Sequence, residues 1–219
     1  KALKEAQALG TVAPYDLSTK GGSVARSTAN AYLISAPGHY RIPLVYGNAI
    51  KNGENNPGSY KTNKRGANIL RNFQDHAGQD ITDPWIEKTN GGSNRGVDGA
   101  EVIWADAAGL VQLSSTPIVR DAAGDAYLDF TVPADNIQSG NAVAAVKKGN
   151  TVIWSWHLWF APEDVLSTIP VTNKQGKVYN FTKETLGWKP TVWEGSSYDK
   201  DRMVKVGIEQ TVANSGIKQ

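Results

Sequence analysis

The sequence predicts an all-β fold: one β-sandwich with Greek-key connections, about nine or ten strands and long surface loops. Short runs rich in β-branched and aromatic residues lie between turns that contain Gly or Pro along most of the chain. Apolar and polar residues alternate within these runs, as in RMVKVGIEQTV (202–212). After the first ten residues no segment keeps a helical period. Many short strands joined by turns favour two packed sheets.

The strands are expected, in chain order, at 31–35, 40–47, 68–73, 101–106, 110–120, 126–132, 141–148, 151–160, 177–182 and 202–212. The turn APGH separates the first two strands, and AGD (123–125) precedes the sixth. Gly149 and Asn150 separate NAVAAVKK from TVIWSWHLWF, which predicts a hairpin with a primed two-residue turn.

The regions between the strands suggest how the chain is divided. The segments 51–67 and 89–100 are rich in Gly, Asn and Ser, so we expect exposed, mobile loops there. Residues 1–27 are expected to form a lead-in, a linker or a processed N-terminal segment. Residues 28–219 are expected to form the β-sandwich domain.

Composition excludes several classes of protein. The 219 residues can bury a sizeable core, and the net charge is only +2, from 23 basic and 21 acidic residues, without a long basic run. Nucleic acid is therefore not expected as a partner. The chain contains no cysteine, no apolar run long enough for a membrane-spanning helix, and no secretory leader at its start. If the protein is exported, we expect its signal peptide to lie outside this chain.

No constellation of residues predicts catalysis or metal binding. The three histidines, His39, His76 and His157, lack the spacing of metal ligands. Asp121, Asp125 and Asp129 recur every fourth position, which differs from a calcium loop and fits a turn around AGD.

Motifs of enzymes are missing as well. The sequence has no nucleophile elbow, phosphate loop or dinucleotide-binding glycine motif. Its acidic residues do not select the pair of facing carboxylates that a glycoside-active enzyme would require. We therefore expect no enzymatic activity, no metal and no cofactor.

The stretch TVIWSWHLWF (151–160) holds three of the seven tryptophans. On a strand, Trp154 and Trp156 share an apolar face with Leu158 and Phe160, which predicts that both rings lie in the core. Burying one such ring contributes roughly 4–6 kcal/mol before entropy is counted. Trp159 lies on the opposite, mixed face and is the candidate for an exposed ring that binds a ligand. A glycan-binding module that uses exposed aromatic rings is therefore an alternative function.

Five segments follow one another in a distinctive order: TANAYLISAPGHYRIPLVYGNAIKNG (28–53), ITDPWI (81–86), AEVIWADAAGLV (100–111), GNAVAAVKKGNTVIWSWHLWFAPED (140–164) and LGWKP (186–190). In this order they resemble blocks of the fimbrillin-like family. Together these blocks cover most of the chain between residues 28 and 190.

The resemblance implies a secreted, non-enzymatic protein of the cell surface or outer membrane of Gram-negative anaerobes. It implies transthyretin-like β-sandwich domains, and assembly with other pilus or surface subunits by donation of a β-strand. A tip or accessory pilus subunit or an adhesin is expected, since the long Gly/Asn loops suit display, and a host or microbial glycan or protein is a further expected partner. The resemblance also places WSWHLW in a central strand, so His157 is expected to be half-buried and hydrogen-bonded.

The chain departs from the family pattern at two positions. Ala31 and Lys189 stand where relatives often have cysteine, and the joint loss is consistent with a pair in those relatives. The resemblance also implies arginine-specific processing, with cleavage expected at Arg26 or at another early arginine.

Overall fold

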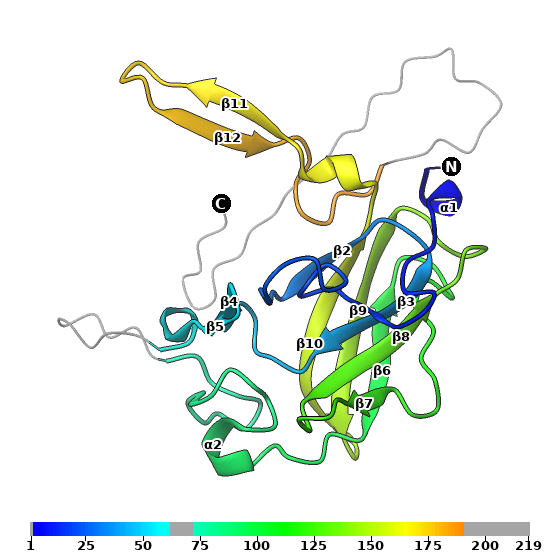
Figure 1. Ribbon diagram of the computed structural model, residues 1–219, viewed down its shortest axis with the longest axis vertical. Coiled ribbons are helices and arrows are strands. Elements are labelled where there is room, and N and C mark those ends of the chain that lie inside the picture. The colour runs from blue at the N-terminus through cyan, green and yellow to red at the C-terminus, as the bar shows by residue number, and fades with distance from the viewer. Residues whose placement is uncertain (1, 62–71, 191–219) are drawn as a thin grey trace, which may run out of the picture.

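The computed structural model describes residues 2–61 and 72–190, and in this part the protein is all-β (Figure 1). Two four-stranded sheets form its body. The first sheet has the order β1 (Tyr15–Asp16), β3 (Gly38–Pro43), β8 (Ala126–Val132) and β7 (Ile118–Arg120). The second sheet has the order β2 (Ala31–Ile34), β10 (Thr151–Phe160), β9 (Gly140–Lys148) and β6 (Gly99–Ala105).

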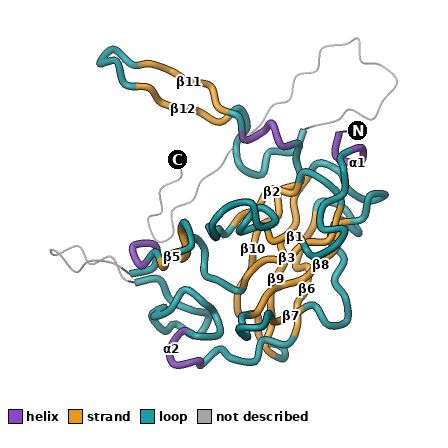
Figure 2. Tube along the Cα trace, in the orientation of Figure 1, coloured by secondary structure: helices purple, strands orange, loops and turns teal. Residues whose placement is uncertain are grey.

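The remaining elements are short and lie outside the two sheets (Figure 2). Two small ribbons are formed by β4 (Ile50–Lys51) with β5 (Glu54–Asn55) and by β11 (Thr168–Thr172) with β12 (Val178–Thr182). The helical turns are α1 (Ala2–Glu5), α2 (Thr89–Gly92) and the 3-10 helices η1 (Pro57–Ser59) and η2 (Glu163–Leu166). Among the described residues no helix is long and apolar enough to cross a membrane.

One apolar core is shared by both sheets. Because side chains alternate along a strand, β8 and β10 each turn one row of large residues inward. The core contains Tyr40, Ile42, Leu128 and Phe130 from the first sheet and Ile34, Trp156, Leu158 and Phe160 from the second. The rings of Tyr40 and Phe130 stack with centroids 5.7 Å apart.

The expected hairpin at 141–160 is confirmed. Lys148 pairs with Thr151 across the two-residue turn, and Gly149 has the positive φ of +56° that the first position of a type II′ turn requires. The register shifts between Val152 and Trp154, so Ile153 is the extra residue of a β-bulge and is buried.

Sequence patterns located most of the long strands. The strands expected at 31–35, 101–106, 126–132, 141–148, 151–160 and 177–182 correspond to β2, β6, β8, β9, β10 and β12. The strand expected at 40–47 begins earlier and ends at Pro43 as β3. Residues 68–71 and 202–212 lie outside the described residues, and Asn72 and Phe73 are not in a strand. The very short β1, β4 and β5, and also β11, were not expected.

The long strand expected at 110–120 is wrong. A strand forms only at its end, as β7, while Gln112 makes an isolated bridge with Thr131. Pro117 has no N–H for a ladder, and the side chain of Ser114 accepts a hydrogen bond from the backbone N–H of Thr116 (3.2 Å). These local features interrupt the pairing.

The described residues before position 27 contact the first sheet and the core. β1 pairs in parallel with β3, and Leu3 is buried in the shared core. Arg26 reaches the phenol oxygen of Tyr127 at 2.8 Å, and its guanidinium lies over the rings of Trp85 and Tyr127 at 5.5 Å from each centroid. The N-terminal segment is therefore anchored to the first sheet.

The loop at 89–100 is not exposed throughout, contrary to expectation. Thr89, Asn94 and Val97 are buried. The amide of Asn94 donates to the hydroxyl of Tyr46 (3.1 Å) and to the carboxylate of Asp75 (3.3 Å). A polar loop can pack inward when its side chains satisfy one another in this way.

Candidate functional site

Among the described residues, each of the two sheets ends on the same side of the molecule in a short strand with no further strand beside it. β1 is the last strand of the first sheet and β2 the last strand of the second. The carbonyls of Asn30 and Ile34 accept hydrogen bonds from the N–H groups of His157 (2.9 Å) and Ala161 (3.2 Å). Because backbone groups alternate in direction along a strand, those of Ala31 and Leu33 point to the open side. That side can accept another strand.

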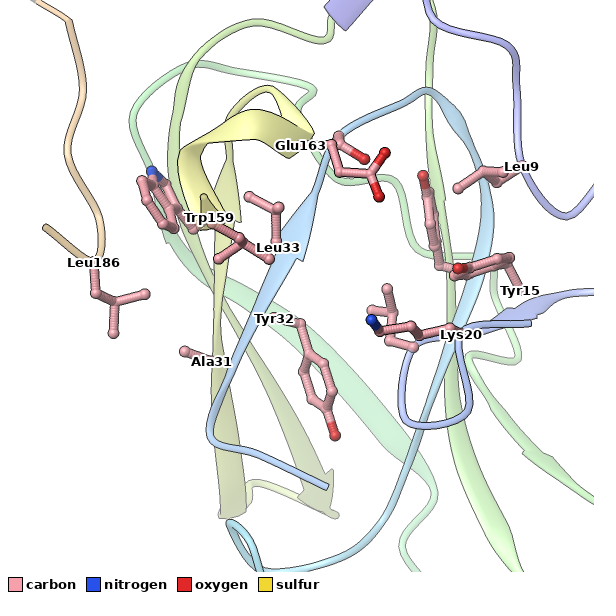
Figure 3. Close-up of a pocket in the computed structure, with 13 residues that line it drawn as sticks. Leu9, Tyr15, Lys20, Ala31, Tyr32, Leu33, Trp159, Glu163 and Leu186 are labelled. Carbon is pink, nitrogen blue, oxygen red and sulfur yellow. The ribbon is translucent and has the colours of Figure 1, made fainter. Parts of the chain in front are cut away.

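A groove lies between these two edges (Figure 3). Its cavity volume is about 290 Å³. We call it the edge groove, and it is lined by Leu9, Tyr15, Leu17, Lys20, Ala31, Tyr32, Leu33, Ser35, Tyr40, Trp159, Glu163, Leu166 and Leu186. Aromatic and aliphatic side chains form most of this lining, so the groove suits apolar side chains of a ligand.

The tyrosines of the edge groove are neutral, and two of their rings contact each other. Burial raises the pKa of Tyr32 to about 12 and also raises the pKa of Tyr15 and Tyr40. The hydroxyl of Tyr40 donates to the carbonyl of Ala36 (2.6 Å), and its ring meets that of Tyr15 edge-on with centroids 5.9 Å apart. The groove therefore has walls of mainly apolar side chains, with two charged groups, Lys20 and Glu163, in its lining.

Trp159 does not have the exposed ring that the sequence suggested. The side chain is 3% exposed, and its indole N–H donates to the carbonyl of Trp188 (2.9 Å). Its ring nevertheless forms part of the wall of the edge groove. The expected exposure of Trp159 is therefore wrong, whereas contact between this ring and a ligand stays a prediction.

The cover over Trp159 is the segment Leu186–Gly187–Trp188–Lys189, which we call the strap. Leu186 lies in the edge groove with Ala31, the carbonyl of Gly187 accepts from the amide of Asn141 (3.0 Å), and Lys189 pairs with Asp106 (3.4 Å). These contacts lead from β2 across β9 to the end of β6. The strap therefore crosses the outer face of the second sheet.

A polar network beneath the strap includes His157, as expected. Its Nε2 lies 2.8 Å from Oδ1 of Asn141, whose amide also donates to Asp106 (3.0 Å). The ring of His157 is partly buried, and burial lowers its pKa. The neutral imidazole is therefore favoured in the folded protein, and the prediction of a half-buried, hydrogen-bonded histidine is confirmed.

The other tryptophans separate into core and surface rings. Trp156 is 1% exposed, and Trp154 is partly buried, with its ring edge-on to that of Tyr46 at a centroid distance of 4.9 Å. The prediction that both rings lie in the core is therefore confirmed for Trp156 and confirmed in part for Trp154. Trp104 pairs with Val143, which pairs with His157, so Trp104 shares the outer face with the strap. Trp104 and Trp188 are 52% and 50% exposed. The sequence interpretation missed both rings.

The remaining candidate residues serve separate local contacts. His39 lies 2.6 Å from the carboxylate of Asp129, and the carboxylate of Asp121 accepts from the N–H groups of Ala123 and Asp125 (both 2.9 Å). His76 lies beside Asp75 in an open hollow away from the edge groove. Within the described residues no group of three or more His, Asp or Glu side chains is placed to hold a metal ion.

No family model, no curated protein and no solved structure matches this chain. The edge groove between β1 and β2 is therefore the feature from which function is inferred.

Proposed function

We propose that this protein is a non-enzymatic, fimbrillin-like protein of the cell surface or outer membrane. In this proposal it is a tip or accessory pilus subunit or an adhesin with a transthyretin-like Greek-key β-sandwich, and it joins other subunits by addition of a β-strand. The ordered blocks between residues 28 and 190 support the family, and the two sheets with a shared core are compatible with the fold.

The observation that carries the proposal is that, among the described residues, no strand pairs with the outer edge of β2 beside the edge groove. A strand that pairs with Ala31 and Leu33 would form new backbone hydrogen bonds on that side. Its side chains would alternate between the two faces of the sheet. One row would meet Tyr32 on the inner face, and the other would meet Leu33, Trp159 and Leu186 on the outer face. An extended segment with apolar residues at alternate positions is therefore the expected partner.

A backbone-directed substitution tests this mode of assembly. Leu33→Pro removes the N–H that faces the open side, while the hydrogen bonds of Tyr32 and Ile34 toward β10 are kept. Leu33→Val is the matched control, since it retains both the N–H and an apolar side chain. In cells that produce the natural protein, we expect Leu33→Pro to abolish assembly into sheared surface fractions and Leu33→Val to assemble normally.

Site-specific photo-crosslinking identifies the contacting edge. A photo-crosslinking amino acid at Leu33 should give adducts with another subunit, whereas the same group at Ile103, which is exposed on the opposite edge strand β6, should give none. Equal crosslinking at both edges, or normal assembly of folded Leu33→Pro protein, would contradict strand addition at β2.

Glycan binding is the second candidate, favoured by the half-exposed rings of Trp104 and Trp188 on one face of the second sheet. Exposed aromatic rings stack on sugar rings, and the amide of Asn141 and the imidazole of His157 lie on the same face. A glycan array checks this candidate. Binding that disappears in both Trp104→Ala and Trp188→Ala would support it, and an array without any hit would remove it.

A further inference from the structure

The ribbon of β11 and β12 extends away from the two sheets (Figure 1). Every residue of both strands is exposed. At its base the N–H of Lys183 donates to the carbonyl of Ser167 (3.1 Å), and at its tip Asn173 closes the turn by accepting from the N–H groups of Gln175 and Lys177. The ribbon is therefore well formed, although its faces are not covered by the other described residues.

One face of this ribbon carries only aliphatic and aromatic side chains. Ile169 pairs with Phe181 and Val171 pairs with Tyr179, and directly opposed residues of an antiparallel pair share a face. We call these four side chains the apolar ribbon face, and they are 48–58% exposed. The opposite face carries Thr168, Pro170, Thr172, Val178, Asn180 and Thr182. The second face is mainly polar but includes Pro170 and Val178, and an apolar face opposite a mainly polar one is typical of a sheet with one buried face.

An isolated two-stranded ribbon is at best marginally stable in water, and it gains stability from packing of its apolar face. The amino-acid sequence supplies a suitable segment after the last described residue. RMVKVGIEQTV (202–212) places Val204, Val206 and Ile208 on one side and Lys205 and Glu209 on the other. Three apolar residues at every second position span about 14 Å, which is comparable with the length of the ribbon, about 17 Å.

The connection between the two segments is long enough. Pro190 lies seven residues after Lys183, and hence within about 25 Å of the base of the ribbon. The eleven residues from 191 to 201 reach up to about 38 Å when extended. Residues 202–212 can therefore return to the ribbon of the same chain.

We propose that residues 202–212 dock on the apolar ribbon face of their own chain, with Val204, Val206 and Ile208 directed at Ile169, Val171, Tyr179 and Phe181. The charged Lys205 and Glu209 then face solvent. This inference does not depend on the proposed surface or pilus function, because it concerns how one chain completes its own packing.

Thiol labelling of the full chain tests the proposal, because the natural sequence has no cysteine. Val171→Cys places a thiol on the apolar ribbon face, and Asn180→Cys places one on the opposite face as a control. Each labelling rate is divided by the rate of the same variant in denaturant. We expect Val171→Cys to react about tenfold more slowly than Asn180→Cys, which corresponds to an opening free energy near 1.4 kcal/mol.

A second substitution identifies the cover. Val206→Asp should restore fast labelling of Val171→Cys, whereas Lys205→Asp, on the solvent side, should not. Fast labelling of Val171→Cys in the unaltered background would overturn the proposal, as would protection that survives Val206→Asp. Protection that increases with protein concentration would also overturn it, and would show that a second copy covers the ribbon.

Discussion

Asn141→Ala should destabilise the protein by removing the side chain that links the strap to the second sheet. The amide of Asn141 donates to Gly187 (3.0 Å) and Asp106 (3.0 Å), and its carbonyl oxygen lies 2.8 Å from Nε2 of His157. Each hydrogen bond contributes about 1 kcal/mol net, and the one to the carboxylate contributes more. Since the residue is only half-buried, water replaces part of the loss. We expect the free energy of unfolding to fall by about 2–3 kcal/mol.

Urea denaturation followed by fluorescence measures this change, and hydrogen exchange locates it. The amides of the strap should exchange faster in Asn141→Ala, while those of the central strand β8 should change only by the global loss of stability. Asn180→Ala, in the exposed strand β12, is the matched control and should change stability by less than about 0.5 kcal/mol. A loss below about 0.5 kcal/mol for Asn141→Ala, or unaltered exchange in the strap, would refute the role of Asn141.

Three further predictions concern the core, the pH dependence and one turn. Trp156→Ala should cost about 3–5 kcal/mol in urea denaturation, because its buried ring leaves a cavity. Burial lowers the pKa of His157 below 6.5, so the stability that its neutral form provides is present above pH 6.5 and is lost as the pH falls through the folded pKa. The free energy of unfolding, measured between pH 7.5 and 5, should therefore depend less on pH in His157→Gln than in the natural protein. The same pH dependence in both proteins would contradict this. Gly10→Ala should lower the free energy of unfolding by more than about 2 kcal/mol, because the new Cβ would lie 1.9 Å from the carbonyl oxygen of His39. Gly124→Ala should lower it by only about 1 kcal/mol, because Gly124 has a φ of +81° but open space around it. Thermal unfolding measures both losses. Equal losses for the two glycines would contradict the steric reason.

Local sequence patterns predict the long strands but little of the structure around them. Alternation and turn residues located β8, β9 and β10 because those strands have one buried face and sharp ends. Two-residue strands such as β1 carry no alternation, and they form because the rest of the sheet offers an edge. Pairing of this kind depends on contacts between distant residues, which a single sequence does not reveal.

The edge groove shows the same limit. Alternation correctly put Trp159 on the face opposite to Trp156, yet it could not show that the strap, almost thirty residues later, lies over that face. A β-bulge between Val102 and Trp104 interrupts the alternation of β6, so the face on which Trp104 lies does not follow from the sequence pattern. The groove itself follows from the proximity of β1 and β2, whose sequences separately contain no site motif.

The parallel pairing of β2 with β10 has a consequence for folding. Ala31 pairs with His157, a separation of 157 − 31 = 126 residues, whereas β9 and β10 pair through a two-residue turn. Contacts between distant residues form late because the chain entropy lost in closing such a long loop is large. During refolding the β9–β10 hairpin should therefore form before β2 joins it. The edge of β10 that later pairs with β2, near Trp156 and Trp159, is then unpaired. In that interval, copies of the chain can pair through β10, and the yield of refolded protein should fall as its concentration rises.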